Sequence, residues 1–171
     1  VSSKRAIINN LTGVWGVTQV VYIFANAIKR LLPVAAEPII KNDLSSVEWT
    51  MYGLWCAYMA YVEGYKAFHL KFSPSVVERS FSIGPDPSVL KVVLAGPYAM
   101  GLFGATRSKM IVSWCITVGV FGLTKIVKAL PYPYRGIVDA GVVLGLSLGL
   151  LSMLYHMAWA LMASRTSTKQ Q

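Results

Sequence analysis

The sequence predicts an all-α integral membrane protein, a single membrane domain over residues 1–171 with about four transmembrane helices. Residues 140–163 contain no acidic or basic side chain. As a helix this stretch measures about 36 Å, more than the roughly 30 Å hydrocarbon core of a bilayer. Charged side chains stand at both ends, with Asp139 before it and Arg165 after it. Of the 171 residues, 55% are hydrophobic and 13% charged, which is typical of a small membrane domain without a soluble module.

Four stretches are predicted to span: residues 11–28, 47–70, 110–127 and 136–163. The first ends at Lys29 and Arg30, whose long stems can reach the lipid headgroups. Pro33 and Pro38 then predict a loop that runs to about residue 46. The last two spans are separated by further prolines near residue 131.

The second span begins with a helix-start signal. Ser45 and Glu48 have the spacing of a capping box, in which each side chain satisfies a free backbone donor of the other residue. Membrane length is reached only by continuing through three ionisable side chains, Glu63, Lys66 and His69. A new, short surface helix is expected after it, opening either at Ser73 before Pro74 or at Ser75, with Glu78 three residues later, and running to about Ser82.

Residues 89–106 are apolar but ambiguous. Lys91 lies near the start, and Gly96 and Pro97 interrupt the middle. The segment is interpreted as re-entrant, as interfacial or as a fifth span. Four spans leave the larger excess of Lys and Arg on the side of the two termini, so the positive-inside rule favours four.

The chain is basic, with 16 Lys and Arg against 7 Asp and Glu and a net charge of +9. In a membrane protein this charge suits anionic lipid headgroups or acidic neighbouring subunits, so no nucleic-acid partner is expected. Cys56 and Cys115 lie in apolar stretches and are expected to be free thiols. Because the sequence begins at Val1, removal of an N-terminal segment is an expectation as well.

Three glycines recur at every fourth position of the last span: Gly141, Gly145 and Gly149. They share one face, where a neighbouring backbone can approach closely. The neighbour is either another helix of this chain or a partner subunit. The spacing does not distinguish the two.

Six aromatic residues are predicted to line one face of the second span: Trp55, Tyr58, Tyr61, Tyr65, Phe68 and Phe72. Such a row can stack on a flat ligand such as a pigment or quinone. An interfacial aromatic belt or a bundle core is the favoured interpretation.

Ionisable residues in predicted spans are candidate functional groups. Glu63 and Lys66 are three residues apart, and Arg135 and Asp139 are four apart, so each pair is expected to form an ion pair.

The two histidines, His69 and His156, are far apart in the sequence. A single histidine can ligate the magnesium of a chlorophyll, but without a companion it makes no metal site, and a hydrogen bond to a neighbouring helix is favoured. No hydrolase, phosphate-loop, zinc or dinucleotide motif is present in the sequence, so no enzyme and no catalytic residue is predicted.

Several segments are similar to a known family. Residues 63–68 (EGYKAF), 72–77 (FSPSVV), 105–107 (ATR) and 135–143 (RGIVDAGVV) resemble an uncharacterised family of small bacterial inner-membrane proteins. The resemblance covers roughly residues 61–151. It implies bacterial-type membrane ancestry, as in a plastid or mitochondrial membrane, and supplies no activity.

These features predict a non-catalytic accessory subunit of a larger energy-transducing membrane complex, preferably a photosystem in a thylakoid, that holds lipid or pigment. The expected cofactor is chlorophyll or carotenoid, with His156, His69 and Glu63 as the binding side chains. The alternative is a small transporter or channel whose polar path uses Glu63, Lys66, Asp139 and Arg135.

Overall fold

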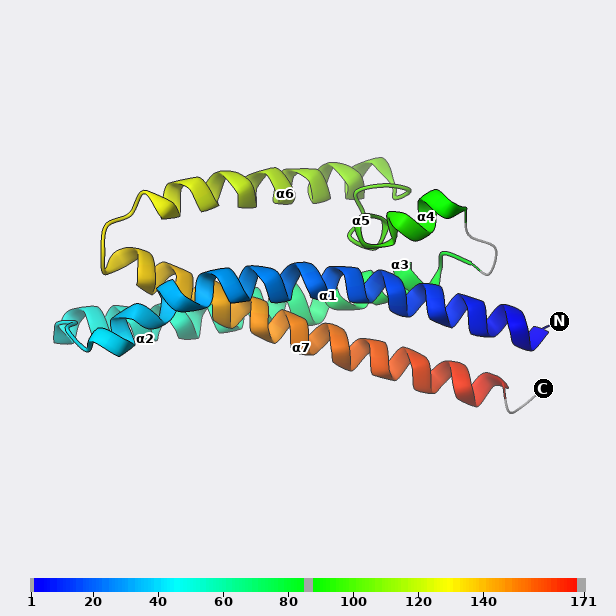
Figure 1. Ribbon diagram of the computed structural model, residues 1–171, viewed down its shortest axis with the longest axis horizontal. Helices are drawn as coiled ribbons and strands as arrows, with labels where there is room; N and C mark the ends of the chain where they lie inside the picture. Colours follow the sequence, from blue (N-terminus) through cyan, green and yellow to red (C-terminus); the bar gives the residue numbers. More distant parts are fainter. Residues whose placement is uncertain (1, 85–87, 169–171) are drawn as a thin grey trace.

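The computed structural model describes residues 2–84 and 88–168, and within these ranges all regular structure is helical, as predicted (Figure 1). Three helices are long and apolar enough to cross a membrane: α1 (Ser2–Lys41), α6 (Arg107–Lys128) and α7 (Tyr134–Thr168). They contain the predicted spans 11–28, 110–127 and 136–163. The fourth predicted span, residues 47–70, is helical but is not among these three.

The first helix is longer than predicted, because α1 continues through Pro33 and Pro38 to Lys41. The expected proline loop is therefore wrong. A proline removes one backbone donor, and close packing on a neighbouring helix can compensate for this. Pro38 packs against Gly136 of α7, where an added Cβ would lie 2.6 Å from the proline ring. The helix ends only at Asn42, whose φ of 49° is typical of a residue that terminates a helix.

The second helix begins at the predicted capping box. The Ser45 backbone N–H donates to Glu48 Oε2 over 2.8 Å, and the Ser45 hydroxyl accepts from the Glu48 backbone N–H. The chain then runs without a break through α2 (Ser46–Met59), η1 (Ala60–Phe72) and α3 (Ser73–Phe81). The middle segment, η1, is a π-helix, which has a wider turn than an α-helix and is often found at functional sites.

The short helix expected to open at Ser73 or Ser75 and to run to about Ser82 is found as α3, but it is neither separate nor on the surface. Instead α3 continues directly from η1, with Pro74 in its first turn, where the missing N–H matters least. One face of α3 is buried, through Ser73, Val76, Val77 and Ser80. This segment therefore belongs to the core of the molecule.

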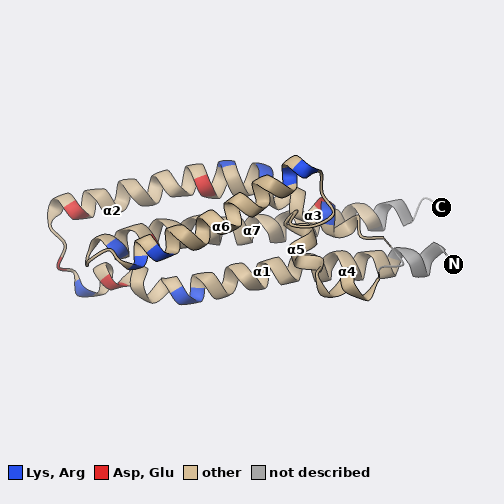
Figure 2. Ribbon diagram, turned by 90° about the horizontal axis from the view of Figure 1, so that it is seen from above, with Lys and Arg blue, Asp and Glu red and all other residues tan. Residues whose placement is uncertain are grey.

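Three rods form the body of the molecule: α1, α7 and the continuous α2–η1–α3 (Figure 1). The chain runs in one direction along α1, returns along α2–η1–α3, crosses again along α6 and returns along α7, so both ends of the described chain lie at the same end of the bundle (Figure 1). The main core consists of Val17, Val20, Phe24, Val76, Val77, Ala99 and Met153. Long uncharged stretches of α1 and α7 separate the charged side chains (Figure 2).

Residues 89–106 do not span. They contain two short helices, α4 (Val89–Val93) and α5 (Ala95–Ala99), each of five residues, too short to cross a bilayer. The second is buried on the bundle, where the backbone N–H of Gly96 donates to Gln19 Oε1 of α1 over 2.7 Å. The fifth-span alternative is thus wrong.

The helix α6 lies beside the bundle and is attached near its ends (Figure 1). None of its 22 residues, all of which the structure describes, is buried. At its first turns, Ser113 Oγ donates to the Met100 carbonyl over 3.0 Å, and Trp114 Nε1 donates to the Leu102 carbonyl over 3.2 Å. Farther along, a Cβ added at Gly119 or Gly122 would meet no atom within 4 Å in the described ranges.

Candidate functional site

The face of α7 that carries Gly141, Gly145 and Gly149 packs against the second helix; we call this contact the glycine seam. A Cβ added at Gly141 would overlap Trp55, and one at Gly145 would lie 2.9 Å from Glu63 Oε2. One at Gly149 would lie 2.8 Å from the Phe68 ring. The spacing left open whether these glycines face another helix of this chain or a partner subunit. All three face side chains of this chain's own bundle.

Polar contacts hold the end of the seam where α7 begins. The indole N–H of Trp55 donates to the Val138 carbonyl over 3.2 Å. One residue farther along α7, the buried Asp139 lies 3.7 Å from the guanidinium of Arg135. This is the ion pair expected from the sequence.

Glu63 lies in the middle of the seam and lacks the partner expected for it. Its Oε2 is buried without a hydrogen-bond partner in the described part of the chain. The expected ion pair with Lys66 is not formed there, because the Lys66 ammonium lies over the Tyr61 ring instead, 4.8 Å from its centroid. An ionisable side chain held between two helices, with one oxygen unsatisfied, is a candidate functional group.

The predicted aromatic face is divided into an inner and an outer set. Phe68 and Phe72 pack inward on Phe24 of α1, with ring centroids 5.2 and 5.8 Å away. Tyr58, Tyr61 and Tyr65, in contrast, are each at least 50% exposed. In an α-helix residues three apart share a face, but the wider π-helical turn separates Tyr65 from Phe68. The single aromatic face would require residues 60–72 to form an α-helix, and they form a π-helix instead.

Residues four apart remain stacked along η1. The rings of Tyr61 and Tyr65 lie 6.3 Å apart at 18°, and those of Tyr65 and His69 lie 5.7 Å apart at 20°. This outer row ends against α7, where the ring of His156 lies 5.3 Å from that of His69. The expectation that each histidine has no companion is therefore wrong, because only the packing of η1 on α7 brings them together.

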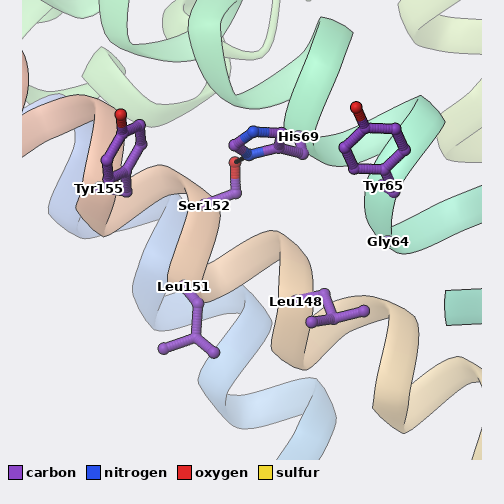
Figure 3. Close-up of a pocket in the computed structure, with 7 residues that line it drawn as sticks. All are labelled: Gly64, Tyr65, His69, Leu148, Leu151, Ser152 and Tyr155. Atoms are coloured by element: carbon purple, nitrogen blue, oxygen red, sulfur yellow. Dashed lines mark hydrogen bonds between the residues drawn. The ribbon is translucent and has the colours of Figure 1, made fainter. Parts of the chain in front are cut away.

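A groove opens beside this histidine pair, with about 340 Å³ of free space. We call it the histidine groove. Its lining consists of Gly64, Tyr65, His69, Leu148, Leu151, Ser152 and Tyr155. Figure 3 shows the His69 ring between the two tyrosines, with the two leucines projecting from α7 below it. Ser152 was not identified from the sequence, although its position one helical turn before His156 was a usable signal.

The three residues predicted to bind a pigment have different environments. Glu63 is turned toward Gly145 in the seam, and Nε2 of His156 is buried without a partner among the described residues. Only His69 lines the groove, with its Nδ1 2.9 Å from Ser152 Oγ. Within the described ranges, no three His, Cys, Asp or Glu side chains come together as a metal site would require.

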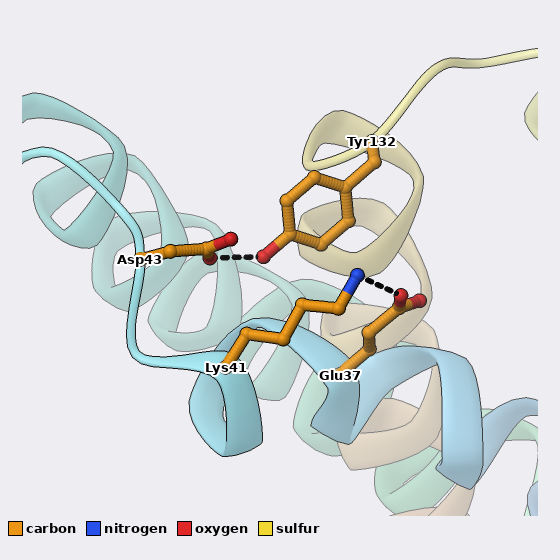
Figure 4. Close-up of polar contacts among 4 residues, drawn as sticks. All are labelled: Glu37, Lys41, Asp43 and Tyr132. Atoms are coloured by element: carbon orange, nitrogen blue, oxygen red, sulfur yellow. Dashed lines mark hydrogen bonds and ion pairs between the residues drawn. The ribbon is translucent and has the colours of Figure 1, made fainter.

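A polar cluster that sequence reasoning missed joins the two loops at the opposite end from the termini (Figure 4). The Tyr132 hydroxyl donates to Asp43 Oδ1, and this bond raises the pKa of Tyr132 to about 12. Lys41 pairs with Glu37 over 2.7 Å and lies 4.4 Å from the centroid of the Tyr132 ring. The cluster holds the start of α7 against the end of α1.

A scan against protein-family models, a search of curated proteins and a search of solved structures find no match for this chain. The function must therefore be argued from the geometry.

Proposed function

We propose that this chain is a non-catalytic accessory subunit of a larger energy-transducing membrane complex, in which it packs against neighbouring helices and holds lipid or pigment. The observation that carries the proposal is α6, an apolar helix of spanning length without a buried residue among its 22 described positions. A helix that its own chain leaves uncovered has its faces free for lipid and for neighbouring subunits.

The glycines of α6 support a protein neighbour. Glycine inside a helix is about 1 kcal/mol less favourable than alanine, so it needs a compensating role. In membranes that role is close helix–helix approach. Gly119 and Gly122 stand three residues apart in the middle of α6, and neither meets an atom of the described chain within 4 Å of an added Cβ. A helix from another subunit would use the space that they leave.

The length of α1 supports a partner as well. Its 40 residues measure about 60 Å, twice the thickness of a bilayer core. Large apolar side chains are nevertheless exposed toward both ends, at Ile7, Leu11, Ile39 and Ile40. Lipid tails cannot cover both ends of an upright helix of this length. A neighbouring subunit would cover what lies outside the bilayer.

The first turns of α6 support lipid binding. One open face of these turns is formed by Arg107, Met110, Ile111, Trp114 and Cys115. One basic side chain next to an apolar wall suits a phospholipid, with the phosphate at Arg107 and an acyl chain along the helix.

For the host membrane we propose the thylakoid, with the mitochondrial inner membrane as the alternative. The resemblance of residues 63–68 and 135–143 to bacterial inner-membrane proteins supports an organelle of bacterial origin. The photosystem-type host rests on the exposed tyrosine row and the histidine groove, which suit a lipid-soluble ring.

The test is the size and absorption spectrum of the native assembly on a native gel, compared with chains carrying Gly119→Leu or Ile116→Leu. We expect wild type and Ile116→Leu to migrate in a large complex. The Gly119→Leu chain should dissociate from that complex, although the isolated chain should be no less stable than wild type. Recovery of the native chain only as a pigment-free monomer or homo-oligomer would refute the proposal.

One observation favours a second function, a small transporter or channel. The unsatisfied Oε2 of Glu63 is an ionisable group between helices, as in many proton or ion pathways. Against it, Lys66 lies outside the seam, over the Tyr61 ring. Flux into vesicles containing the purified chain, abolished by Glu63→Gln, would establish this alternative.

A further inference from the structure

We propose that the histidine groove binds the ring of a lipid-soluble quinone, with His69 Nε2–H donating a hydrogen bond to a quinone carbonyl. This inference deepens the proposed function and rests on it, since it names the class of lipid-soluble molecule that the subunit holds. It depends on three observations: the contact between His69 Nδ1 and Ser152 Oγ, the size of the groove, and the nature of its walls.

The proton position follows from Ser152. Hydroxyls on these helices commonly donate to the carbonyl four residues earlier, as Thr18 does over 2.8 Å and Ser147 over 2.7 Å. Ser152 makes no such bond within the described chain; its hydroxyl lies 2.9 Å from His69 Nδ1. The hydroxyl proton needs an acceptor, and among the described residues Nδ1 lies within hydrogen-bond distance of it.

If Ser152 donates to Nδ1, a neutral His69 carries its proton on Nε2. An Nε2–H is a hydrogen-bond donor and has no lone pair to offer a metal. His69, which lines the groove, is then a hydrogen-bond donor and not a magnesium ligand. A carbonyl oxygen is the complementary group, and among lipid-soluble molecules with a flat ring a quinone carries it directly on the ring.

The dimensions agree with a single ring. About 340 Å³ is near the lower end of the range for small-molecule sites. This space can hold one substituted six-membered ring. The sequence predicts His69 as one of three chlorophyll ligands, and a proton on its Nε2 argues against that role.

The walls of the groove suit the rest of a quinone. Tyr65 and Tyr155 stand on either side of His69, where their rings can contact a flat ligand and their hydroxyls can donate (Figure 3). Leu148 and Leu151 form an apolar surface along α7 for ring methyl groups and the isoprenoid tail. Tyr155 and Leu151 are 59% and 62% exposed, so the groove is open to a molecule arriving from the lipid.

The experiment uses the purified full chain in detergent micelles and a short-chain alkyl benzoquinone as the probe. Binding is measured by calorimetry, and the carbonyl stretch of the bound quinone by infrared difference spectroscopy. We expect wild type to bind and to shift the carbonyl band to lower frequency. His69→Phe keeps a ring to stack on Tyr65 but removes the donor, so it should bind about tenfold more weakly and lose the shift.

Two further variants make the result specific. Ser152→Ala keeps His69 but frees its proton to move to Nδ1, so we expect weaker binding, by a smaller factor than for His69→Phe. Tyr22→Phe changes an exposed tyrosine of α1 outside the groove lining and should bind as wild type does. If His69→Phe fails to fold, Ser152→Ala and the infrared shift still test the proposal.

Three outcomes would overturn the inference: equal binding by His69→Phe, equal binding of an alkylbenzene with the same chain, or His69-dependent binding of chlorophyllide in place of the quinone. Failure here differs from failure of the proposed function. A chain found in a large complex but unable to bind quinone refutes the inference alone. A quinone-binding chain without any complex refutes the accessory role.

Discussion

The helices α6 and α7 are both long and apolar, yet they occupy opposite environments. In the most apolar stretch of α7, 44% of the residues are buried, whereas in that of α6 the share is 0%. Both contain glycines in mid-helix. The space beside Gly141, Gly145 and Gly149 of α7 is occupied by Trp55, Glu63 and Phe68. Beside Gly119 and Gly122 of α6, no atom of the described chain lies within 4 Å of an added Cβ.

This difference shows that apolarity and packing are separate properties of a membrane helix. Lipid tails are as apolar as leucine, so apolarity does not drive one helix onto another once both are in a membrane. Shape and hydrogen bonds decide that step. In α7 the small residues face side chains that fill the space, and the Trp55 indole adds a bond to a carbonyl.

The largest expected effect compares one glycine from each helix. Gly141→Leu would force the Trp55 ring and Met59 out of the seam. We expect it to lower the free energy of unfolding by about 3 kcal/mol. Gly119→Leu adds the same side chain to open space, so it should cause no loss, and the better helix propensity of leucine should raise the free energy of unfolding by up to about 1 kcal/mol. Loss of helical circular dichroism during titration with SDS measures both, and similar effects would contradict the comparison.

The next prediction concerns the buried carboxyl of the seam. Glu63→Met replaces a side chain whose Oε2 is unsatisfied with a flexible apolar one. We expect the free energy of unfolding to rise by about 2 kcal/mol, because a desolvated polar atom without a partner is removed. Glu63→Gln, which remains polar, should have a smaller effect. Destabilisation by the methionine in the same SDS titration would mean that Glu63 has a partner outside the chain or a structural role.

A smaller effect is expected from the indole of the seam. Trp55→Phe keeps an aromatic ring beside Gly141 but removes the bond to the Val138 carbonyl. The expected loss is about 1 kcal/mol of unfolding free energy. Trp159→Phe on α7, where the side chain is 64% exposed, is the matched control and should change stability little. Equal losses would show that the indole bond adds no stability.

The smallest effect concerns the loop cluster and its pH dependence. The bond to Asp43 raises the pKa of Tyr132 to about 12 from the usual 10.0, so the stabilisation is complete below pH 10 and is lost as the pH rises through 12. The melting temperature of wild type should exceed that of Tyr132→Phe by a constant amount between about pH 7 and pH 10, where Asp43 is ionised and Tyr132 is neutral. The gap should then close by pH 12. A gap that persists at pH 12 would rule out this bond as its source.

Much of the architecture was predictable from local sequence signals. The uncharged stretch at residues 140–163 and the Ser45–Glu48 capping box appear where they were predicted, because spanning length and caps depend on neighbouring residues alone. The proline loop was wrong because Pro38 is accommodated by Gly136 of a helix nearly a hundred residues away.

The candidate site was less predictable, since it depends on the type of helix. An α-helix was assumed for residues 60–72, and this assumption put Tyr65 and Phe68 on one face. In the π-helix the tyrosines continue to His69 and the phenylalanines turn into the core. No local signal for the wider turn was recognised in the sequence.

The sequence by itself determined that this protein is a bundle of apolar helices of membrane length, and where several of them begin, because these properties depend on composition and on contacts within a few residues. Tertiary structure alone decided that side chains of the second helix occupy the space beside the α7 glycines, and that the space beside the α6 glycines is empty in the described chain. It also decided that Glu63 faces Gly145 and that His69 meets Ser152 and His156. These are contacts between helices, set by the shapes of surfaces that are distant in the chain.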